Sequence, residues 1–176
     1  MRDYARISPQ FWTGETGKAI KVLGSECQVV ALYLLTSPHS NMIGLYYLPI
    51  QYICHETGST LEGASKSLLS LNTIGFCDYD HNSEFVWVFE MARFQIGTML
   101  KEADKRVKGI SNTYESMQKN KFLGPFFDRY MDDFHLKNRR GLVGASKPLR
   151  SNGEWRMENG DGEGKWRRIL KAPPNE

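Results

Sequence analysis

The sequence has little of what marks an exported or membrane-spanning protein. Its longest apolar runs, such as residues 29–35, are far shorter than the roughly 20 residues that a membrane helix needs. The first residues, Met-Arg-Asp-Tyr, contain no apolar signal core. The three cysteines, Cys27, Cys54 and Cys77, are odd in number and widely spaced in apolar surroundings, which indicates reduced core residues rather than disulfides. We therefore expect a cytoplasmic protein that does not contact a membrane.

The sequence also lacks the common signatures of metal sites, nucleotide-binding loops and hydrolases. No CxxC, HxxxH or HExxH pattern occurs, and no GxxxxGK[S/T] loop is present. Residues 130–133 spell YMDD, the catalytic tetrapeptide of reverse transcriptases. That chemistry needs the two aspartates on a β-hairpin beside a third carboxylate, whereas the flanking pattern here is helical, which favours coincidence. We expect no metal, no cofactor and no catalytic residue, and hence a protein that is not an enzyme.

Charge is unevenly distributed over the 176 residues. Residues 1–90 carry five Lys or Arg against nine Asp or Glu, for a net charge of −4. Residues 91–176 carry 18 against 11, for a net charge of +7, and the two halves together give the formal +3. Neutralisation of phosphates supplies much of the affinity of DNA-binding proteins. Any DNA-binding hypothesis must therefore account for a basic surplus that lies in the C-terminal half.

Residues 49–90 carry the strongest structural pattern. Residues 49–57 favour a helix, with proline at its first position and Gly58 just past its end. Ser59 and Glu62 have the spacing of a capping box that opens a second helix, which ends before Gly75. The apolar stripe of this second helix consists of Leu61, Ala64, Leu68, Leu71 and Ile74.

Short strands and a further helix surround this predicted helix pair. Strands over residues 76–80 and 84–90 are joined across a polar turn at residues 81–83. A helix over residues 25–36 and a β-prone segment at residues 44–48 precede the pair. This order predicts an α+β fold, a mostly helical winged helix-turn-helix domain with a small β-hairpin as its wing.

The pattern changes after residue 90. Residues 102–120 are polar and weakly helical, and residues 122–136 form a strong aromatic helix pattern. The residues predicted on one side of that aromatic helix are Phe126, Phe127, Tyr130, Met131 and Phe134. We predict a winged-helix domain over residues 1–100 and a helical extension over residues 101–140.

Both ends of the chain have weak apolar periodicity. Residues 1–24 have a glycine-rich middle and are expected to be irregular. Residues 141–176 contain six glycines, three prolines and two tryptophans among scattered charges. Such a segment buries too little apolar surface to offset its ordering entropy, so we predict a mostly disordered basic tail. Its tryptophans and basic residues suit stacking on single-stranded bases, and suit a solubilising tail equally well.

The exposed face of the predicted second helix is a candidate DNA-binding surface. It offers hydroxyl groups and one lysine, but almost none of the Arg, Asn and Gln side chains that most often bind bases. The predicted base or phosphate contacts are Ser59, Lys66, Ser67 and Ser70, and the predicted backbone contacts are Lys101, Lys105 and Arg106. The hairpin carries Asp78, Asp80 and Glu84, which argues against a wing that holds phosphates.

Several segments together resemble a known family. They are residues 6–12 (RISPQFW), 28–36 (QVVALYLLT), 38–42 (PHSNM), 44–49 (GLYYLP), 55–58 (HETG), 62–66 (EGASK), 75–76 (GF), 122–130 (FLGPFFDRY) and 137–141 (KNRRG). Over roughly residues 1–150 the chain resembles the N-terminal region of prophage replication proteins of the replisome-organiser type. The resemblance implies a winged-helix domain that binds the phage origin, and a C-terminal region that recruits a helicase or its loader. After Arg150 we find no second domain, so origin binding is the part that the resemblance carries over.

Two main hypotheses and one minor hypothesis follow from the sequence. The first is a non-catalytic protein of phage or prophage origin that acts in replication initiation and inserts residues 59–73 into the major groove of double-stranded origin DNA. The second is a phage-encoded module of the same fold that docks or inhibits a host replication or defence complex through its acidic hairpin and aromatic helix. The third is a scaffold that forms homo-oligomers through residues 122–136.

Overall fold

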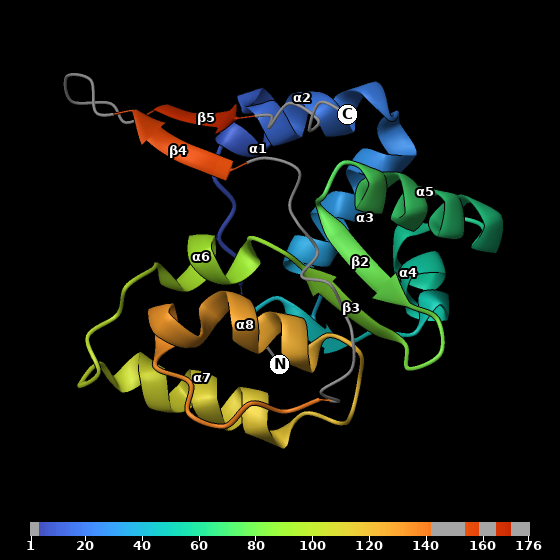
Figure 1. The fold of residues 1–176 in the computed structure, drawn as a ribbon. Helices are drawn as coiled ribbons and strands as arrows, with labels where there is room; N and C mark the ends of the chain where they lie inside the picture. Colours follow the sequence, from blue (N-terminus) through green and yellow to red (C-terminus); the bar gives the residue numbers. More distant parts are fainter. Residues whose placement is uncertain (1–3, 142–153, 159–164, 170–176) are drawn as a thin grey trace, which may run out of the picture. The chain divides into compact units, whose positions relative to one another are not determined.

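The computed structural model describes residues 4–141, 154–158 and 165–169 of the chain. They belong to two compact units, Met1–Val143 and Gly144–Glu176. The described part of the first unit contains eight helices and a three-stranded antiparallel sheet (Figure 1). The second unit contains a two-stranded antiparallel sheet. None of the helices in the described ranges is long and apolar enough to cross a membrane.

The elements follow one another in a mixed order. The helices are α1 (Gln10–Thr13), α2 (Glu15–Val22), α3 (Ser25–Thr36), α4 (Ile50–Thr57), α5 (Leu61–Thr73), α6 (Met91–Ile96), α7 (Lys105–Ser116) and α8 (Leu123–Phe134). The strands are β1 (Leu45–Tyr47), β2 (Cys77–Asp80) and β3 (Phe85–Val88) in the first unit, and β4 (Glu154–Glu158) and β5 (Lys165–Ile169) in the second.

Strand β3 lies in the middle of the three-stranded sheet, between β1 and β2. Leu45 pairs with Trp87 on one side and Cys77 pairs with Val88 on the other. Successive side chains of a strand point to opposite faces, yet all four residues of β3 are buried. Both faces of the sheet are therefore covered, which explains why the β3 sequence FVWV is apolar at every position.

One face of the sheet packs against helices α2 to α5. Val86 and Val88 of β3 share a hydrophobic cluster with residues of these helices, among them Val30, Leu34 and Leu68. Two buried tyrosines of the sheet also form hydrogen bonds through their hydroxyl groups on this side. Tyr46 donates a hydrogen bond to the carbonyl of Leu34 at 2.6 Å, and Tyr79 donates to the carbonyl of Leu48 at 3.0 Å. Both hydroxyl groups can be buried without a large loss of free energy, because each donates a hydrogen bond to a backbone carbonyl.

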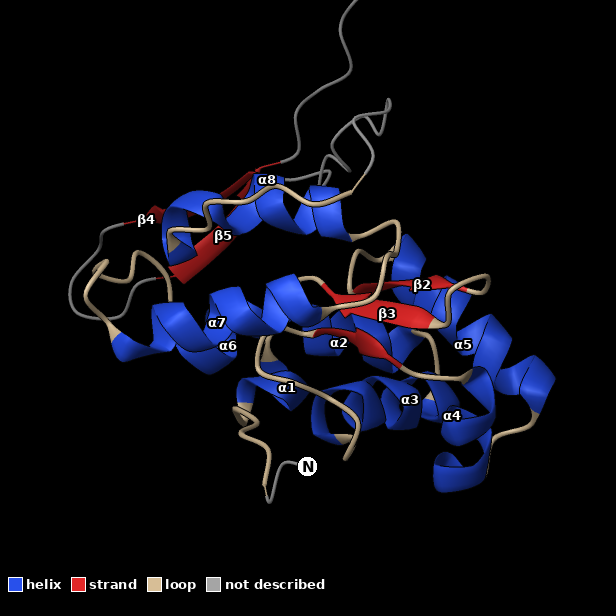
Figure 2. Ribbon diagram, turned by 90° about the horizontal axis from the view of Figure 1, so that it is seen from below, coloured by secondary structure: helices blue, strands red, loops and turns tan. Residues whose placement is uncertain are grey.

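The opposite face packs against helices α6 to α8, so the sheet lies between two helical layers (Figure 2). Trp87 points into this second core, where its ring centroid lies 6.0 Å from that of Phe126 and 6.1 Å from that of Phe122. Phe126 in turn lies 5.0 Å from Tyr130 and 5.8 Å from Tyr114. These separations are typical of aromatic pairs, which contribute beyond the area that they bury.

Gly44 is needed where the chain enters β1. Its φ of 71° lies in the left-handed region, and a Cβ atom at this position would lie 2.6 Å from the Cβ of Met91. The Gly44 carbonyl accepts a hydrogen bond from the N–H of Val88 at 2.8 Å. Glycine therefore lets the chain pass close to the start of α6 while it joins the sheet.

Much of the predicted layout is confirmed. The fold is α+β and mostly helical, and helices occupy the regions predicted at residues 25–36, 49–57 and 122–136. The helix α4 ends as expected at Gly58, which has a φ of 74°. The predicted domain boundary at residue 100 falls within one hydrophobic core. Helix α6 lies before this boundary and α7 and α8 lie after it, yet all three helices contribute to the core that also contains Trp87.

Three predictions about local structure are wrong. Residues 1–24 contain helices α1 and α2 rather than an irregular lead-in, and Ile20 is buried in the first core. Met131 is 41% exposed and does not share the buried side of α8. Strands β4 and β5 fall within the segment predicted to be disordered, with Glu154 opposite Ile169, and the rest of that segment after residue 141 lies outside the described residues.

Phe126 tests how far the fold depends on the aromatic core. Its side chain is fully buried, so Phe126→Ala should lower the free energy of unfolding by about 3–5 kcal/mol through lost burial and a residual cavity. Phe94 is 77% exposed, and Phe94→Ala serves as the matched control with an expected change below about 0.5 kcal/mol. Urea denaturation followed by circular dichroism measures both values. Equal effects of the two substitutions would contradict this assignment of the core.

Candidate nucleic-acid interface

The connection between α4 and α5 sets where the second helix of the pair begins. Thr60 is the N-cap of α5, and its hydroxyl oxygen accepts a hydrogen bond from the N–H of Gly63 at 3.0 Å. The predicted capping box of Ser59 and Glu62 is therefore wrong by one residue. Ser59 is half-buried, and its N–H donates to the hydroxyl oxygen of Thr57 at 3.3 Å. Serine and threonine are both favoured at helix N-caps, so sequence alone does not decide between them.

The burial of its side chains shows which side of α5 faces the core. Ser67 is only 2% exposed, so its predicted place on the DNA-facing surface is wrong. It lies three residues after Ala64 and four before Leu71, and both of these are buried on the same side of the helix. Leu61, which the sequence pattern assigned to the apolar stripe, is instead 58% exposed.

The outer side of α5 combines polar and apolar groups. Lys66 is exposed and has no hydrogen bond or ion pair with any described residue. Ser70 is half-buried. Leu69 is 69% exposed, and with Leu61 it gives this side of the helix two large apolar side chains. The sequence offered a signal for Leu69, because this residue falls outside the predicted apolar stripe that runs from Leu61 to Ile74.

Carboxylates outnumber cations around this helix. Residues 49–90 contain Lys66 as their only basic residue against six Asp or Glu. On the hairpin, Asp78 pairs with Lys121 at 3.3 Å, and Glu84 accepts a hydrogen bond from the Tyr47 hydroxyl at 2.6 Å. The hydrogen bond to the Glu84 carboxylate raises the pKa of Tyr47. These contacts give the hairpin acids structural partners, and they leave the hairpin without a free cation for phosphate.

The predicted backbone contacts on and beside α7 differ from one another. Arg106 donates to the Asp104 carboxylate at 2.7–3.2 Å and to the carbonyl of Ile96 at 2.7 Å. The Arg106 side chain, helped by its backbone N–H, lowers the pKa of Asp104 to about 2. Arg106 thus ties the start of α7 to the end of α6. Lys101 and Lys105 are exposed and have no hydrogen bond or ion pair with a described residue.

The two predicted groups of DNA contacts do not come together. Helix α5, with Lys66, packs on one face of the sheet, whereas α7, with Lys105, packs on the other (Figure 2). A straight DNA duplex in contact with α5 would therefore not reach the basic side chains of α7. Contact with both helices would require the DNA to bend around the edge of the sheet. Within the described residues, no group of three His, Cys, Asp or Glu side chains has an arrangement that would hold a metal ion.

The two hydroxyl residues before α5 allow a direct test of the cap. Thr60→Ala should destabilise the protein by about 1 kcal/mol, because the N–H of Gly63 loses its acceptor. Ser59→Ala is the matched control and should change stability by less than half of that, because the Ser59 side chain does not cap the helix. Thermal unfolding of both variants gives the comparison. A larger loss for Ser59→Ala would restore the capping box that the sequence pattern suggested.

No known protein family, curated protein or solved structure matches this chain closely enough to assign it. The surface must therefore be interpreted from its own chemistry. That chemistry consists of one unpaired lysine and two exposed leucines on α5, an acidic hairpin, and a separate lysine-bearing helix on the other side of the sheet.

Proposed function

We propose that the segment from α3 to β3 is a winged helix-turn-helix domain and that the protein binds double-stranded DNA without catalysis. In this proposal α5 enters the major groove, and the protein acts in the initiation of phage or prophage DNA replication. The observation that carries the proposal is the order of elements, α3, β1, α4, α5, β2 and β3, with β3 paired between β1 and β2. Helix-turn-helix proteins use the second helix of such a pair to contact base edges.

The outer side of α5 supports this use in part. Lys66 is free to bind a phosphate or a guanine edge, and Ser70 supplies a hydroxyl group nearby on the same helix. Ser67 is not available because it is buried. The proposal therefore keeps Lys66, Ser59 and Ser70 on the DNA side of the domain, with Lys101 and Lys105 as additional cations on the far side of the sheet.

The three lysines of this proposal imply a shallow dependence of the DNA affinity on salt concentration. Each neutralised phosphate contributes a slope of roughly −0.9 to the plot of log affinity against log salt. If Lys66, Lys101 and Lys105 all contact phosphates, the total slope is about −3, and contact by Lys66 alone gives about −1. This is far below the slope of a strongly basic DNA-binding protein, so specific contacts from α5 must supply much of the affinity.

Lys66→Ala tests the role of α5. We expect weaker binding to a fluorescent duplex that carries a phage origin, and a salt slope smaller by about 1 if Lys66 contacts a phosphate. Lys119→Ala is the matched control, because Lys119 is also an exposed lysine without a described partner but lies beyond the end of α7. Fluorescence anisotropy at several salt concentrations measures both quantities. Unchanged binding by Lys66→Ala would reject α5 as the recognition helix.

A second function is favoured by the acid surplus of residues 49–90 and by the exposed Leu61 and Leu69. In this alternative the same domain docks a host replication or defence protein. Interfaces commonly place exposed apolar side chains at their centre and charged ones at the rim. The alternative predicts no measurable duplex binding at low salt, and it predicts a host partner that stays bound after nuclease treatment but is lost on Leu69→Asp.

A further inference from the structure

We propose that the outer side of helix α7 holds the phosphate backbone of a second DNA duplex, so that the protein joins two segments of DNA. The residues of this surface are Lys101, Lys105, Lys108, Gly109 and Asn112. Helix α7 packs on one face of the sheet and α5 packs on the other (Figure 2). The joining of two duplexes rests on the proposed DNA binding by α5, whereas binding by the α7 surface does not depend on it.

The buried residues of α7 show which of its sides is open. They are Val107, Ile110 and Tyr114. All three pack in the second core. Lys105, Gly109 and Asn112 are spaced four and three residues apart, so they share one side of the helix. Successive residues turn by about 100°, which places this side opposite the buried one and places Lys108 next to it. All four of these residues are exposed.

Positive charge without a partner collects on this part of the chain. Residues 101–121 contain six Lys or Arg against three Asp or Glu, for a net charge of +3. Each of the three carboxylates has a polar partner, and the pairs are Glu102–Lys137 at 3.4 Å, Asp104–Arg106 at 2.7 Å and Glu115–Asn138 at 3.2 Å. Lys101, Lys105 and Lys108, by contrast, have no hydrogen bond or ion pair with a described residue. These three ammonium groups are therefore available to a polyanion.

Gly109 is a residue that the fold itself does not need. Glycine is less favourable than alanine in the interior of a helix, and Gly109 lies inside α7. A Cβ atom at this position would meet no heavy atom within 4 Å, so neighbouring side chains do not require glycine. The missing side chain leaves a low place beside Lys105, Lys108 and Asn112, where the backbone of a ligand can come close to the helix. This is the feature that a merely solvated helix surface does not explain.

The chemistry of this surface favours a nucleic acid over a protein. None of the exposed large apolar side chains of the described residues lies on α7, whereas protein interfaces commonly place such side chains at their centre. A phosphate backbone needs spaced cations and hydrogen-bond donors, which the lysines and the Asn112 amide supply. Such contacts are independent of base sequence. A straight duplex on α5 does not reach α7, so the backbone held by α7 belongs to a second duplex.

Substitutions of Gly109 separate DNA binding from folding. Gly109→Ala should raise the melting temperature by about 2–4 °C, because alanine favours the helix and its Cβ atom meets no neighbour. Gly109→Leu should also be at least as stable as the natural chain, since leucine is a good helix former. Its affinity for a labelled duplex of random sequence should nevertheless fall by about tenfold, because the side chain keeps the phosphate backbone away. Full affinity of Gly109→Leu overturns the proposal.

The lysines of α7 are tested through the salt dependence of the same binding. Lys105→Ala combined with Lys108→Ala should make the plot of log affinity against log salt less steep by about 2, because two phosphate contacts are lost. Lys119→Ala removes an exposed lysine beyond the end of α7 and should leave the slope unchanged. Fluorescence anisotropy with the full chain measures the slopes. An unchanged slope for the double variant, or equally strong competition by polyglutamate and DNA, rejects the phosphate-backbone site.

A capture assay tests whether two duplexes are held at once. An origin duplex is fixed to beads, and a fluorescent duplex of unrelated sequence is added with the full chain. We expect the protein to capture the fluorescent duplex, and Gly109→Leu to stay on the beads without capturing it. Absence of capture by the natural chain, or full capture by Gly109→Leu, overturns the joining of two duplexes.

The two proposals fail in different ways. If Lys66→Ala leaves origin binding unchanged while Gly109→Leu loses random duplex, α5 is not the recognition helix and the α7 surface stands. If Lys66→Ala weakens origin binding while the Gly109 and lysine variants bind random duplex like the natural chain, DNA binding by α5 stands and the α7 surface is rejected.

Discussion

Burial of β3 from both sides is the constraint on which the rest of the structure depends. Phe85 and Trp87 enter one core, and Val86 and Val88 enter the other, so one four-residue strand joins two helical layers. Removal of either layer would leave apolar side chains of the central strand in water. Helices α6 to α8 are therefore an integral part of the first unit rather than an appendage. This arrangement also fixes which surfaces remain open for binding, because neither face of the sheet is free.

The sequence predicted elements where local signals are strong, and failed where tertiary contacts decide. Helix α4 has a proline at its start and Gly58 at its end, and both signals are local. Ser59 and Thr60 have similar capping ability, so local sequence does not decide between them, and in the structure Thr60 is the N-cap of α5. Ser67 lies on the same side of α5 as Ala64 and Leu71, whereas Leu61 lies in the first turn and stays 58% exposed, and the packing of the helix decides both outcomes.

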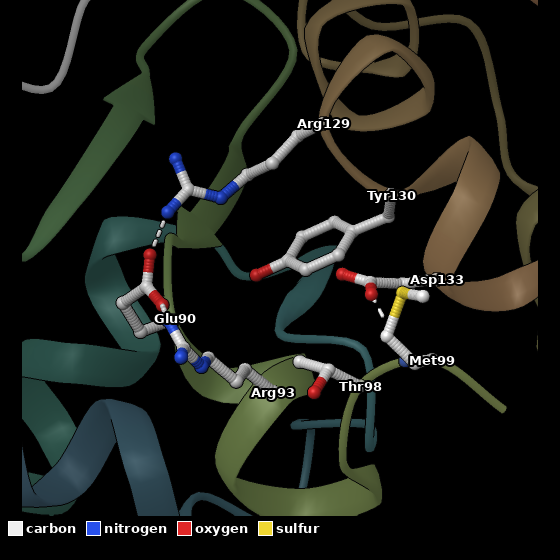
Figure 3. Close-up of a pocket in the computed structure, with 7 residues that line it drawn as sticks. All are labelled: Glu90, Arg93, Thr98, Met99, Arg129, Tyr130 and Asp133. Carbon is white, nitrogen blue, oxygen red and sulfur yellow. Dashed lines mark hydrogen bonds and ion pairs between the residues drawn. The ribbon is translucent and has the colours of Figure 1, made fainter. Parts of the chain in front are cut away.

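A pocket between α6 and α8 is lined by charged side chains from both elements, and sequence patterns could not predict it for a different reason (Figure 3). Glu90 and Arg93 are close in sequence, but Arg129 and Asp133 come from a helix more than 30 positions later. Only the packing of α8 on the second core brings these side chains together. The aromatic residues of α8 predicted that one side of this helix is buried, and they did not predict which element the opposite, charged side would meet.

The distribution of charge separates two kinds of surface on one scaffold. Around α5, carboxylates with structural partners surround a single unpaired lysine, so any contact with DNA there must rely on shape and hydrogen bonds more than on charge. On the other side of the sheet, the Glu90 carboxylate forms ion pairs with Arg93 and Arg129, so these cations already have a carboxylate partner. A phosphate or a carboxylate from a partner would have to compete with Glu90 for these two arginines.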